Sequence, residues 1–108
     1  MSTTQHPFRF GVVAAHVQSR TDWIAKAQKV EDLGYDTLLV VDHITTGLGP
    51  LVSLAFAAEA TKKLRLGTFV LCNDFRHPAF LAKELATLDL LSQGRFEFGL
   101  GAGYLSSD

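Results

Sequence analysis

Short apolar runs alternate with helical patterns along almost the whole chain of 108 residues. The clearest run, from Leu38 to Val41, is too short for a helix and contains no polar residue, which is typical of a parallel strand buried on both faces. Similar runs recur about every 25–30 residues, with segments of helical length between them. This order predicts strand–helix–strand–helix–strand–helix–strand, with parallel strands and right-handed crossovers.

The turn residues mark where the predicted helices begin and end. Thr21 or Asp22 can cap the first helix with a side-chain oxygen, and Gly34 is placed to end it. Pro50 and Pro78 suit the first positions of the second and third helices. The third helix is expected to present a stripe formed by Leu81, Leu85 and Leu88. The predicted strands cover residues 8–15, 38–41, 64–71 and 95–100.

Composition limits the classes of function. Hydrophobic residues make up 47% of the chain and charged residues 19%, which is typical of a protein that forms a core. A net charge of −1 gives no electrostatic reason to bind nucleic acid or an anionic membrane. The single cysteine, the lack of a signal-peptide pattern and the absence of a membrane-length apolar run lead us to expect a cytoplasmic protein. We expect residues 1–7 to be a tail and residues 8–108 to form one domain.

Four parallel strands with three helices cannot have both faces of the sheet covered. An eight-unit barrel typically needs about 250 residues, so the pattern fits either a small doubly wound sheet or the first half of a barrel. A half barrel would have open edges at its first and fourth strands. It could be an unstable truncated product, a unit completed by self-association, or a fragment of a longer polypeptide. We expect self-association that covers the open edges.

Polar side chains follow each predicted strand, where the carboxyl ends of parallel strands meet. One interpretation is a metal site, and hence a small metal-dependent hydrolase, because imidazole and carboxylate groups are common ligands. No His-x-His pair occurs to strengthen that hypothesis. The residues that could converge as ligands are His16, Asp42, His43 and His77.

A second interpretation is a proton-transfer or redox site built around a bound cofactor. His43 could exchange a proton near neutral pH, and Asp42 could orient its ring. Spacing alone favours a structural interpretation of the same pair, in which Asp42 would cap the following loop and His43 would pack in the mouth. The glycines at 99, 101 and 103 allow either close contact with a ligand or tight packing of the backbone.

Two further residues favour structural interpretations. Cys72 is expected to be a small buried side chain rather than a nucleophile. Arg76 could reach an anionic group, although pairing with a carboxylate such as Glu84 or Asp89 is the simpler expectation.

Six segments together cover nearly all of the chain from Phe8 onward. They are Phe-Arg-Phe-Gly-Val at 8–12, Glu-Asp-Leu-Gly-Tyr-Asp-Thr-Leu-Leu-Val-Val-Asp-His at 31–43, Leu-Arg-Leu-Gly-Thr-Phe-Val-Leu at 64–71, Asn-Asp-Phe-Arg-His-Pro at 73–78, Ala-Thr-Leu-Asp-Leu-Leu-Ser-Gln-Gly-Arg-Phe at 86–96 and Gly-Leu-Gly-Ala-Gly-Tyr at 99–104. Together these segments resemble the bacterial luciferase-like superfamily. The segments at 73–78 and 99–103 particularly resemble its deazaflavin (coenzyme F-420)-dependent oxidoreductases.

The resemblance implies an α/β fold in which residues 8–108 form a partial luciferase-like barrel domain, the N-terminal half of a TIM-type (α/β)8 barrel with about four βα units. It also implies an oxidoreductase that transfers hydride between a small organic substrate and F-420, or a flavin-dependent monooxygenase if the coenzyme is FMN. A catalytically silent half barrel that serves as an assembly module is the alternative from another class. Family members run to roughly 300 residues, so half of the barrel is missing from this chain.

Individual site residues also come from the resemblance. His43 corresponds to the catalytic histidine of the deazaflavin-dependent dehydrogenases. Phe69 and Val70 correspond to a non-prolyl cis peptide that supports the coenzyme ring. Tyr104 stands where the sugar-phosphate dehydrogenases have a catalytic glutamate, so that substrate is not implied here. The residues expected to contact the coenzyme are Asp42, Phe69, Val70, Cys72, Ala102 and Gly103.

Overall fold

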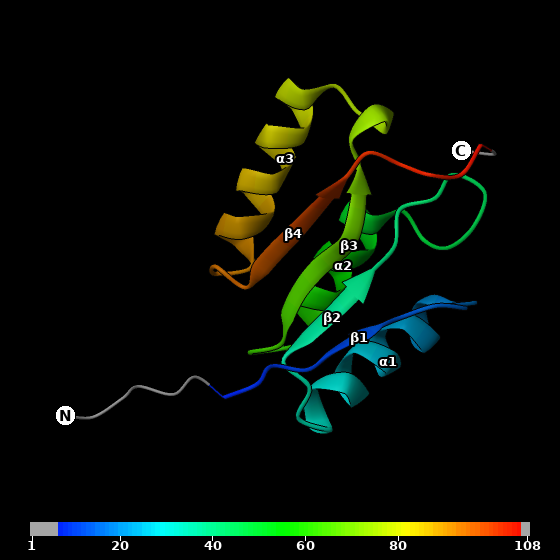
Figure 1. Ribbon diagram of the computed structural model, residues 1–108. Coiled ribbons are helices and arrows are strands. Elements are labelled where there is room, and N and C mark those ends of the chain that lie inside the picture. Colours follow the sequence, from blue (N-terminus) through cyan, green and yellow to red (C-terminus); the bar gives the residue numbers. More distant parts are fainter. Residues whose placement is uncertain (1–6, 107–108) are drawn as a thin grey trace.

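The computed structural model describes residues 7–106, and of the predicted tail only Pro7 falls within this range. The described chain forms a four-stranded sheet with the order β1-β2-β3-β4, and all neighbouring strands are parallel (Figure 1). This confirms the predicted α/β class. The elements are β1 (Gly11–Val13), α1 (Arg20–Asp32), β2 (Thr37–Val40), α2 (Pro50–Ala60), β3 (Arg65–Cys72), the 3-10 helix η1 (Asn73–Phe75), α3 (Pro78–Leu91) and β4 (Phe96–Gly101).

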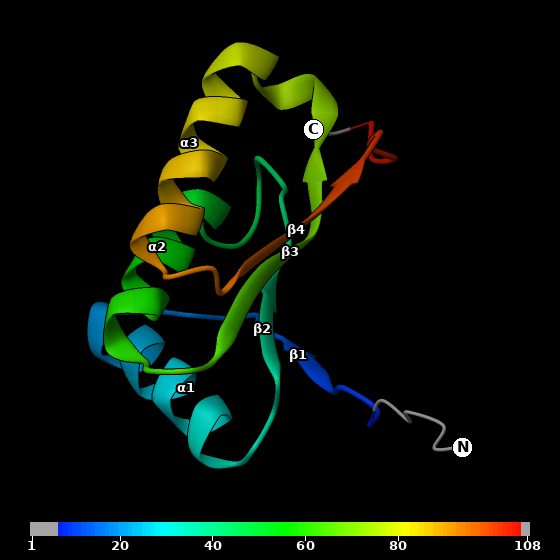
Figure 2. The same ribbon diagram turned by 90° about the vertical axis from the view of Figure 1, so that its left-hand side faces the viewer.

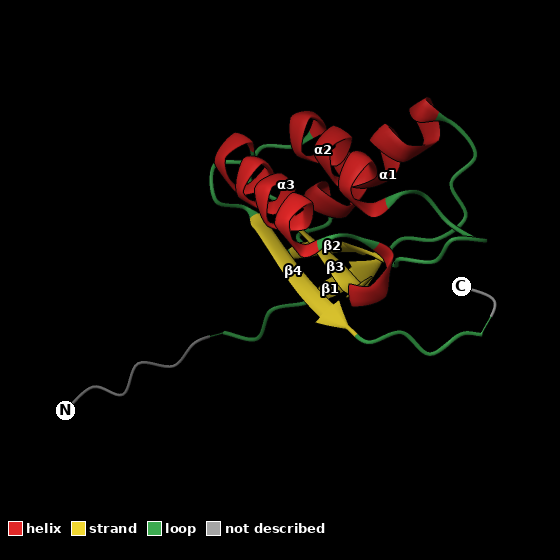
Figure 3. Cartoon of the chain, turned by 90° about the horizontal axis from the view of Figure 1, so that it is seen from above, coloured by secondary structure: helices red, strands yellow, loops and turns green. Residues whose placement is uncertain are grey.

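The three α-helices lie on one face of the sheet, and the opposite face has no covering element among residues 7–106 (Figures 2 and 3). Right-handed crossovers between parallel strands that follow one another in a sheet place every helix on the same side. A doubly wound sheet would have helices on both faces. The arrangement therefore agrees with consecutive units of a barrel.

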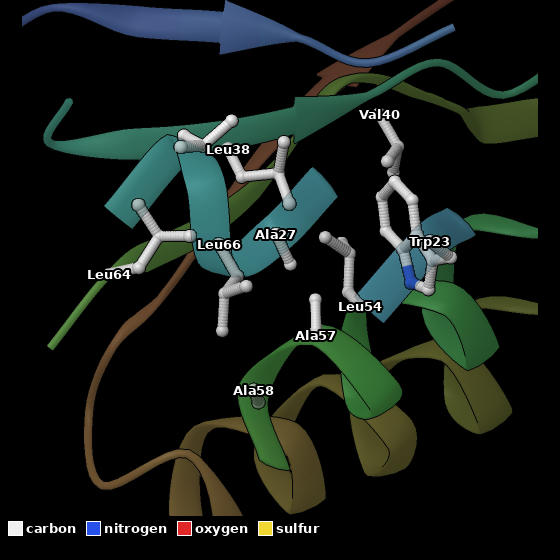
Figure 4. Packing of buried hydrophobic residues seen from close by; sticks show 10 residues of the cluster. Trp23, Ala27, Leu38, Val40, Leu54, Ala57, Ala58, Leu64 and Leu66 are labelled. Atoms are coloured by element: carbon white, nitrogen blue, oxygen red, sulfur yellow. The ribbon is translucent and has the colours of Figure 1, made fainter. Parts of the chain in front are cut away.

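The core lies between the sheet and the first two helices (Figure 4). Leu38 and Leu66 extend from the sheet toward Leu54 on α2, and all three are fully buried. The side chains of Ala27 and Ala57 are also completely buried, and their small size lets the helices approach closely. Among the described residues, the buried side chains of the sheet thus belong mainly to β2 and β3.

Some predicted boundaries need correction. Ser19 caps α1, because its Oγ accepts a hydrogen bond from the Asp22 backbone N–H at 3.0 Å. The predicted cap at Thr21 or Asp22 is therefore wrong by two or three positions. Gly34 follows the helix with φ of +89°, as predicted for a residue that ends it. In the predicted stripe of α3, Leu81 alone is buried, because α3 packs at the edge of the sheet.

One carboxylate anchors the start of β3. Glu31, near the end of α1, accepts hydrogen bonds from the backbone N–H groups of Lys62, Lys63 and Leu64 at 2.8–3.2 Å. Burial raises the pKa of Glu31, but the three N–H donors outweigh this, so the pKa lies below its usual range. The Glu-Asp-Leu-Gly segment thus fixes how α1 meets the third strand.

A charged cluster occupies the open face of the sheet. Strand alternation places Thr37, Arg65 and Glu97 on the side opposite the buried leucines. Arg9 and Arg65 both donate to Oε1 of Glu97, and Arg9 also reaches Thr37 Oγ1 at 3.4 Å. We call Arg9, Arg65 and Glu97 the open-face cluster; it contains two cations and one anion.

Candidate active site

A cleft of about 330 Å³ lies at the carboxyl ends of the strands. The segment after β4 crosses toward the loop that follows β2 and forms one side of it (Figure 1). Parallel sheets collect functional groups at this edge because every strand delivers its last residue there. The lining residues are Val41, Asp42, His43, Phe69, Val70, Cys72, Gly103 and Tyr104.

The structure brings together most of the residues expected to contact a coenzyme. His43 and five of the six expected contacts line this single cleft. Ala102 is exposed and is not among the lining residues. Sequence reasoning missed Val41 as a lining residue, although its place at the end of an apolar run could have indicated it. Tyr104 was treated only as a departure from the dehydrogenase pattern, yet it forms part of the wall.

Two rings face each other across the cleft. His43 follows β2 and is half-buried, while Tyr104 follows β4 and is exposed. Their ring centroids are 5.8 Å apart with planes inclined at 84°, an edge-to-face contact. The imidazole therefore lies at the surface of the cleft, beside the exposed phenol ring.

Asp42 is the most constrained charged residue of the cleft. Its Oδ2 accepts hydrogen bonds from Arg76 Nη1 at 2.5 Å and from the Cys72 backbone N–H at 2.8 Å, and Oδ1 accepts from Arg76 Nη2 at 3.0 Å. Burial raises the pKa of Asp42, but these donors and the charge of Arg76 outweigh it, so the pKa lies below its usual range. Arg76 pairs with this carboxylate, which corrects the expected pairing with Glu84 or Asp89.

The end of β3 forms an apolar wall of the cleft. The peptide bond between Phe69 and Val70 is cis, as the resemblance implies, and the pairing with β4 shifts register between Thr68 and Leu71. At this irregularity the Thr68 hydroxyl donates to the Gly99 carbonyl at 3.0 Å and accepts from the Gly99 N–H at 2.9 Å. The Phe69 side chain is 63% exposed and offers a flat apolar surface.

The glycines of β4 have a packing role. A Cβ on Gly101 would lie 2.4 Å from Cγ2 of Val70, and one on Gly99 would lie 2.9 Å from the Thr68 carbonyl oxygen. A Cβ on Gly103 would lie 3.0 Å from Cys72 Sγ, and Gly103 also has φ of +87°. Of the two open interpretations, tight packing explains Gly99 and Gly101, whereas Gly103 also lines the cleft.

The four candidate metal ligands do not form a ligand set in the part of the chain that the structure describes. His16 is exposed on the loop after β1. His77 caps α3, where its Nδ1 accepts from the Ala79 N–H at 3.1 Å. Both oxygens of Asp42 already bind Arg76. The geometry gives the metal-site hypothesis no support.

A family model described as luciferase-like monooxygenase matches residues 4–108. The chain belongs to this luciferase-like family. The match includes all of the described elements and every residue that lines the cleft.

Several known proteins are similar to this chain in sequence or in structure. The 4-hydroxyprotoasukamycin monooxygenase of Streptomyces nodosus subsp. asukaensis is 40% identical over 86 residues, covering 76% of this chain and 23% of that protein. The coenzyme F420-dependent tetrahydromethanopterin reductase of Methanopyrus kandleri superposes with a TM-score of 0.80 at 30% identity, over 89% of this chain and 27% of that one. The oxygenating constituent of 3,6-diketocamphane monooxygenase from Pseudomonas putida, solved in complex with FMN, has a TM-score of 0.80 at 22% identity, over 92% and 30% of the two chains, which shows the shared fold.

Length separates this chain from those luciferase-like proteins. The chain spans about a quarter of the length of the curated relatives it matches. The comparison thus covers the first four strands of the family's barrel and the cleft at their ends. In residues 7–106, no helix has the length and apolar character needed to cross a membrane.

Proposed function

We propose that this chain is the coenzyme-binding part of a luciferase-like oxidoreductase that takes the deazaflavin F-420, with FMN as the alternative. The observation that carries the proposal is the position of His43 in one cleft with the apolar wall at Phe69 and Val70 and the turn at Gly103. An exposed flat wall suits the face of a fused-ring heterocycle, and an imidazole beside it suits proton exchange.

Bound deazaflavin supplies a carbon that accepts or donates a hydride. His43 would handle the proton that accompanies this hydride. In the oxidation of a small organic alcohol, a ring nitrogen of His43 would accept the hydroxyl proton while the coenzyme accepts the hydride from the carbon. In reduction, the same nitrogen would return a proton to the alkoxide oxygen of the product. The phenol ring of Tyr104 lies edge-to-face with His43 in the same cleft and would contact a substrate bound beside the imidazole.

Titration of the purified chain with F-420 and, separately, with FMN tests this proposal. We expect a saturable change in the absorbance and fluorescence of one coenzyme. His43→Ala should slow hydride transfer by at least about 100-fold while changing the dissociation constant much less. The matched control is His16→Asn, because His16 is exposed, lies outside the cleft and has φ of 59°, which asparagine accommodates. No response to either coenzyme would contradict the proposal.

A second candidate role, an assembly module, is favoured by the edges of the sheet. In the described chain β1 and β4 each pair with one strand only, and Val13, Phe98 and Leu100 are exposed along them. We propose that a second copy covers these edges. Placing β4 of one copy beside β1 of the other continues the parallel order, and a two-fold axis would close the ring at eight strands.

A further inference from the structure

The carboxylate of Asp42 connects three separate segments of the chain. It belongs to the exit of β2, it binds the backbone of Cys72 at the end of β3, and it binds the side chain of Arg76 from the connection between η1 and α3. Asp42 is only 7% exposed, so water cannot replace these partners easily. A buried carboxylate with both oxygens bound is a fixed point for all three segments.

Arg76 contributes to this fixed point from outside the cleft. It is not a lining residue, and its side chain is 24% exposed, so it reaches Asp42 from the solvent side. Its two bonds to the carboxylate are parallel, a geometry that a planar guanidinium provides and an ammonium group does not. Any influence of Arg76 on the cleft must therefore pass through Asp42.

The backbone of Cys72 connects Asp42 to the apolar wall formed by Phe69 and Val70. Its N–H lies two residues after Val70, and the opposite side of Val70 is held by the close packing of Gly99 and Gly101. The side chain of Cys72 also packs against Gly103 at the far side of the cleft. The wall is thus held on the β4 side by glycine packing and on the β2 side by Asp42.

We propose that Arg76 is a positioning residue, which acts through Asp42 to fix the Phe69–Val70 wall and the backbone that leads into His43. Without Arg76, the buried carboxylate would keep one N–H donor and would tend either to take up a proton or to turn toward water. Both changes loosen its bond to Cys72. This inference rests on the proposed coenzyme site for its functional meaning, but the wall itself can be observed without coenzyme.

The test compares Arg76→Met and Arg76→Lys with Arg95→Met. Arg95 makes four hydrogen bonds at the opposite end of the strands, to the carbonyls of Ala58, Leu64 and Ser92 and to Thr61 Oγ1, so its loss measures a structural effect outside the cleft. The first readout is amide hydrogen exchange of Cys72 relative to the core amides of β2, in the chain without coenzyme. The second is the dissociation constant of whichever coenzyme binds.

We expect Arg76→Met to speed the relative exchange of Cys72 about tenfold and to weaken coenzyme binding by a similar factor. Arg76→Lys, which keeps the charge and loses the two-bond geometry, should fall between Met and wild type. Arg95→Met should change neither the relative exchange of Cys72 nor the dissociation constant of the coenzyme. Equal effects of the Arg76 and Arg95 variants, or unchanged Cys72 exchange in Arg76→Met, would overturn the inference. If wild type binds no coenzyme, the proposed function fails, and the exchange ratio still decides whether Arg76 fixes the wall.

Discussion

Val70 fills the space beside Gly101 so closely that a Cβ at that glycine would meet Cγ2 of Val70 at 2.4 Å. The valine side chain is branched at Cβ and has few rotamers with which to move away. Gly99 and Gly101 of β4 therefore lie so close to the irregular end of β3 that a larger side chain would not fit at either position.

Gly101→Ala should destabilise the chain by about 1–3 kcal/mol, because the added methyl group forces Val70 or the backbone to move. Adding Val70→Ala should recover most of this loss. Urea unfolding followed by the fluorescence of Trp23, the one tryptophan of the chain, measures both effects. Gly49→Ala is the matched control, since a Cβ there meets nothing within 4 Å.

Glu31→Gln should cost about 1–3 kcal/mol of folding free energy, because three backbone N–H groups converge on the charged Oε2 of Glu31 and a neutral amide oxygen accepts them more weakly. The neighbouring Asp32 is exposed, and Asp32→Asn should stay within about 0.5 kcal/mol of wild type. Chemical denaturation of the two variants under identical conditions gives the comparison. A cost for Glu31→Gln as small as that of Asp32→Asn would mean that the anchor contributes little.

Acid should weaken the fold partly through Asp42. Its pKa is lower in the folded chain than the ordinary value of about 3.9, so the unfolded state takes up the proton first. The stabilisation is complete above the unfolded pKa and is lost as pH falls through the folded one. Asp42→Asn should be less stable than wild type at pH 7. Its free energy of unfolding should also fall less between pH 5 and pH 2 than that of wild type.

Measuring the urea midpoint of unfolding at several pH values between 5 and 2 checks the expected pH dependence of stability. Glu31 and Glu97 also have lowered pKa values, so part of the acid sensitivity should persist in Asp42→Asn. Asp89→Asn, at an exposed position on α3, serves as the control. If the urea midpoint of Asp42→Asn fell with pH as steeply as that of wild type, the role assigned to this carboxylate would be contradicted.

If a second copy covers the edges of β1 and β4, the midpoint of thermal unfolding should rise with protein concentration, since association stabilises the folded state by mass action. Scans over about a hundredfold range of concentration, with sedimentation to give the molecular mass, test this expectation. A cooperative transition that is independent of concentration, in a monodisperse monomer, would rule out the assembly.

Local signals in the sequence were sufficient for the order of elements. The apolar run at Leu38 and the helix-ending Gly34 each act through neighbouring residues, and the structure places both as expected. The first cap was misplaced because Ser19, Thr21 and Asp22 are all good capping residues, and only the path of the chain after β1 decides among them.

Contacts between distant residues were not predictable in the same way. Arg76 lies 34 positions from Asp42, and nothing in the spacing distinguishes that partner from Glu84 or Asp89 on the following helix. Likewise, the need for glycine at position 101 depends on how Val70 is oriented in the adjacent strand. The candidate site could be located from the strand ends, but the bonds that organise it required the fold.

The open-face cluster has a consequence for how the sheet can be covered. Arg9 and Arg65 share the single carboxylate of Glu97, which leaves one positive charge in excess. A surface that removes this face from water without supplying an anion leaves that charge buried and unpaired, which is costly. Two copies that enclose the cluster would bring two excess cations together, so their association should strengthen as salt is added, in contrast to an interface held by opposite charges.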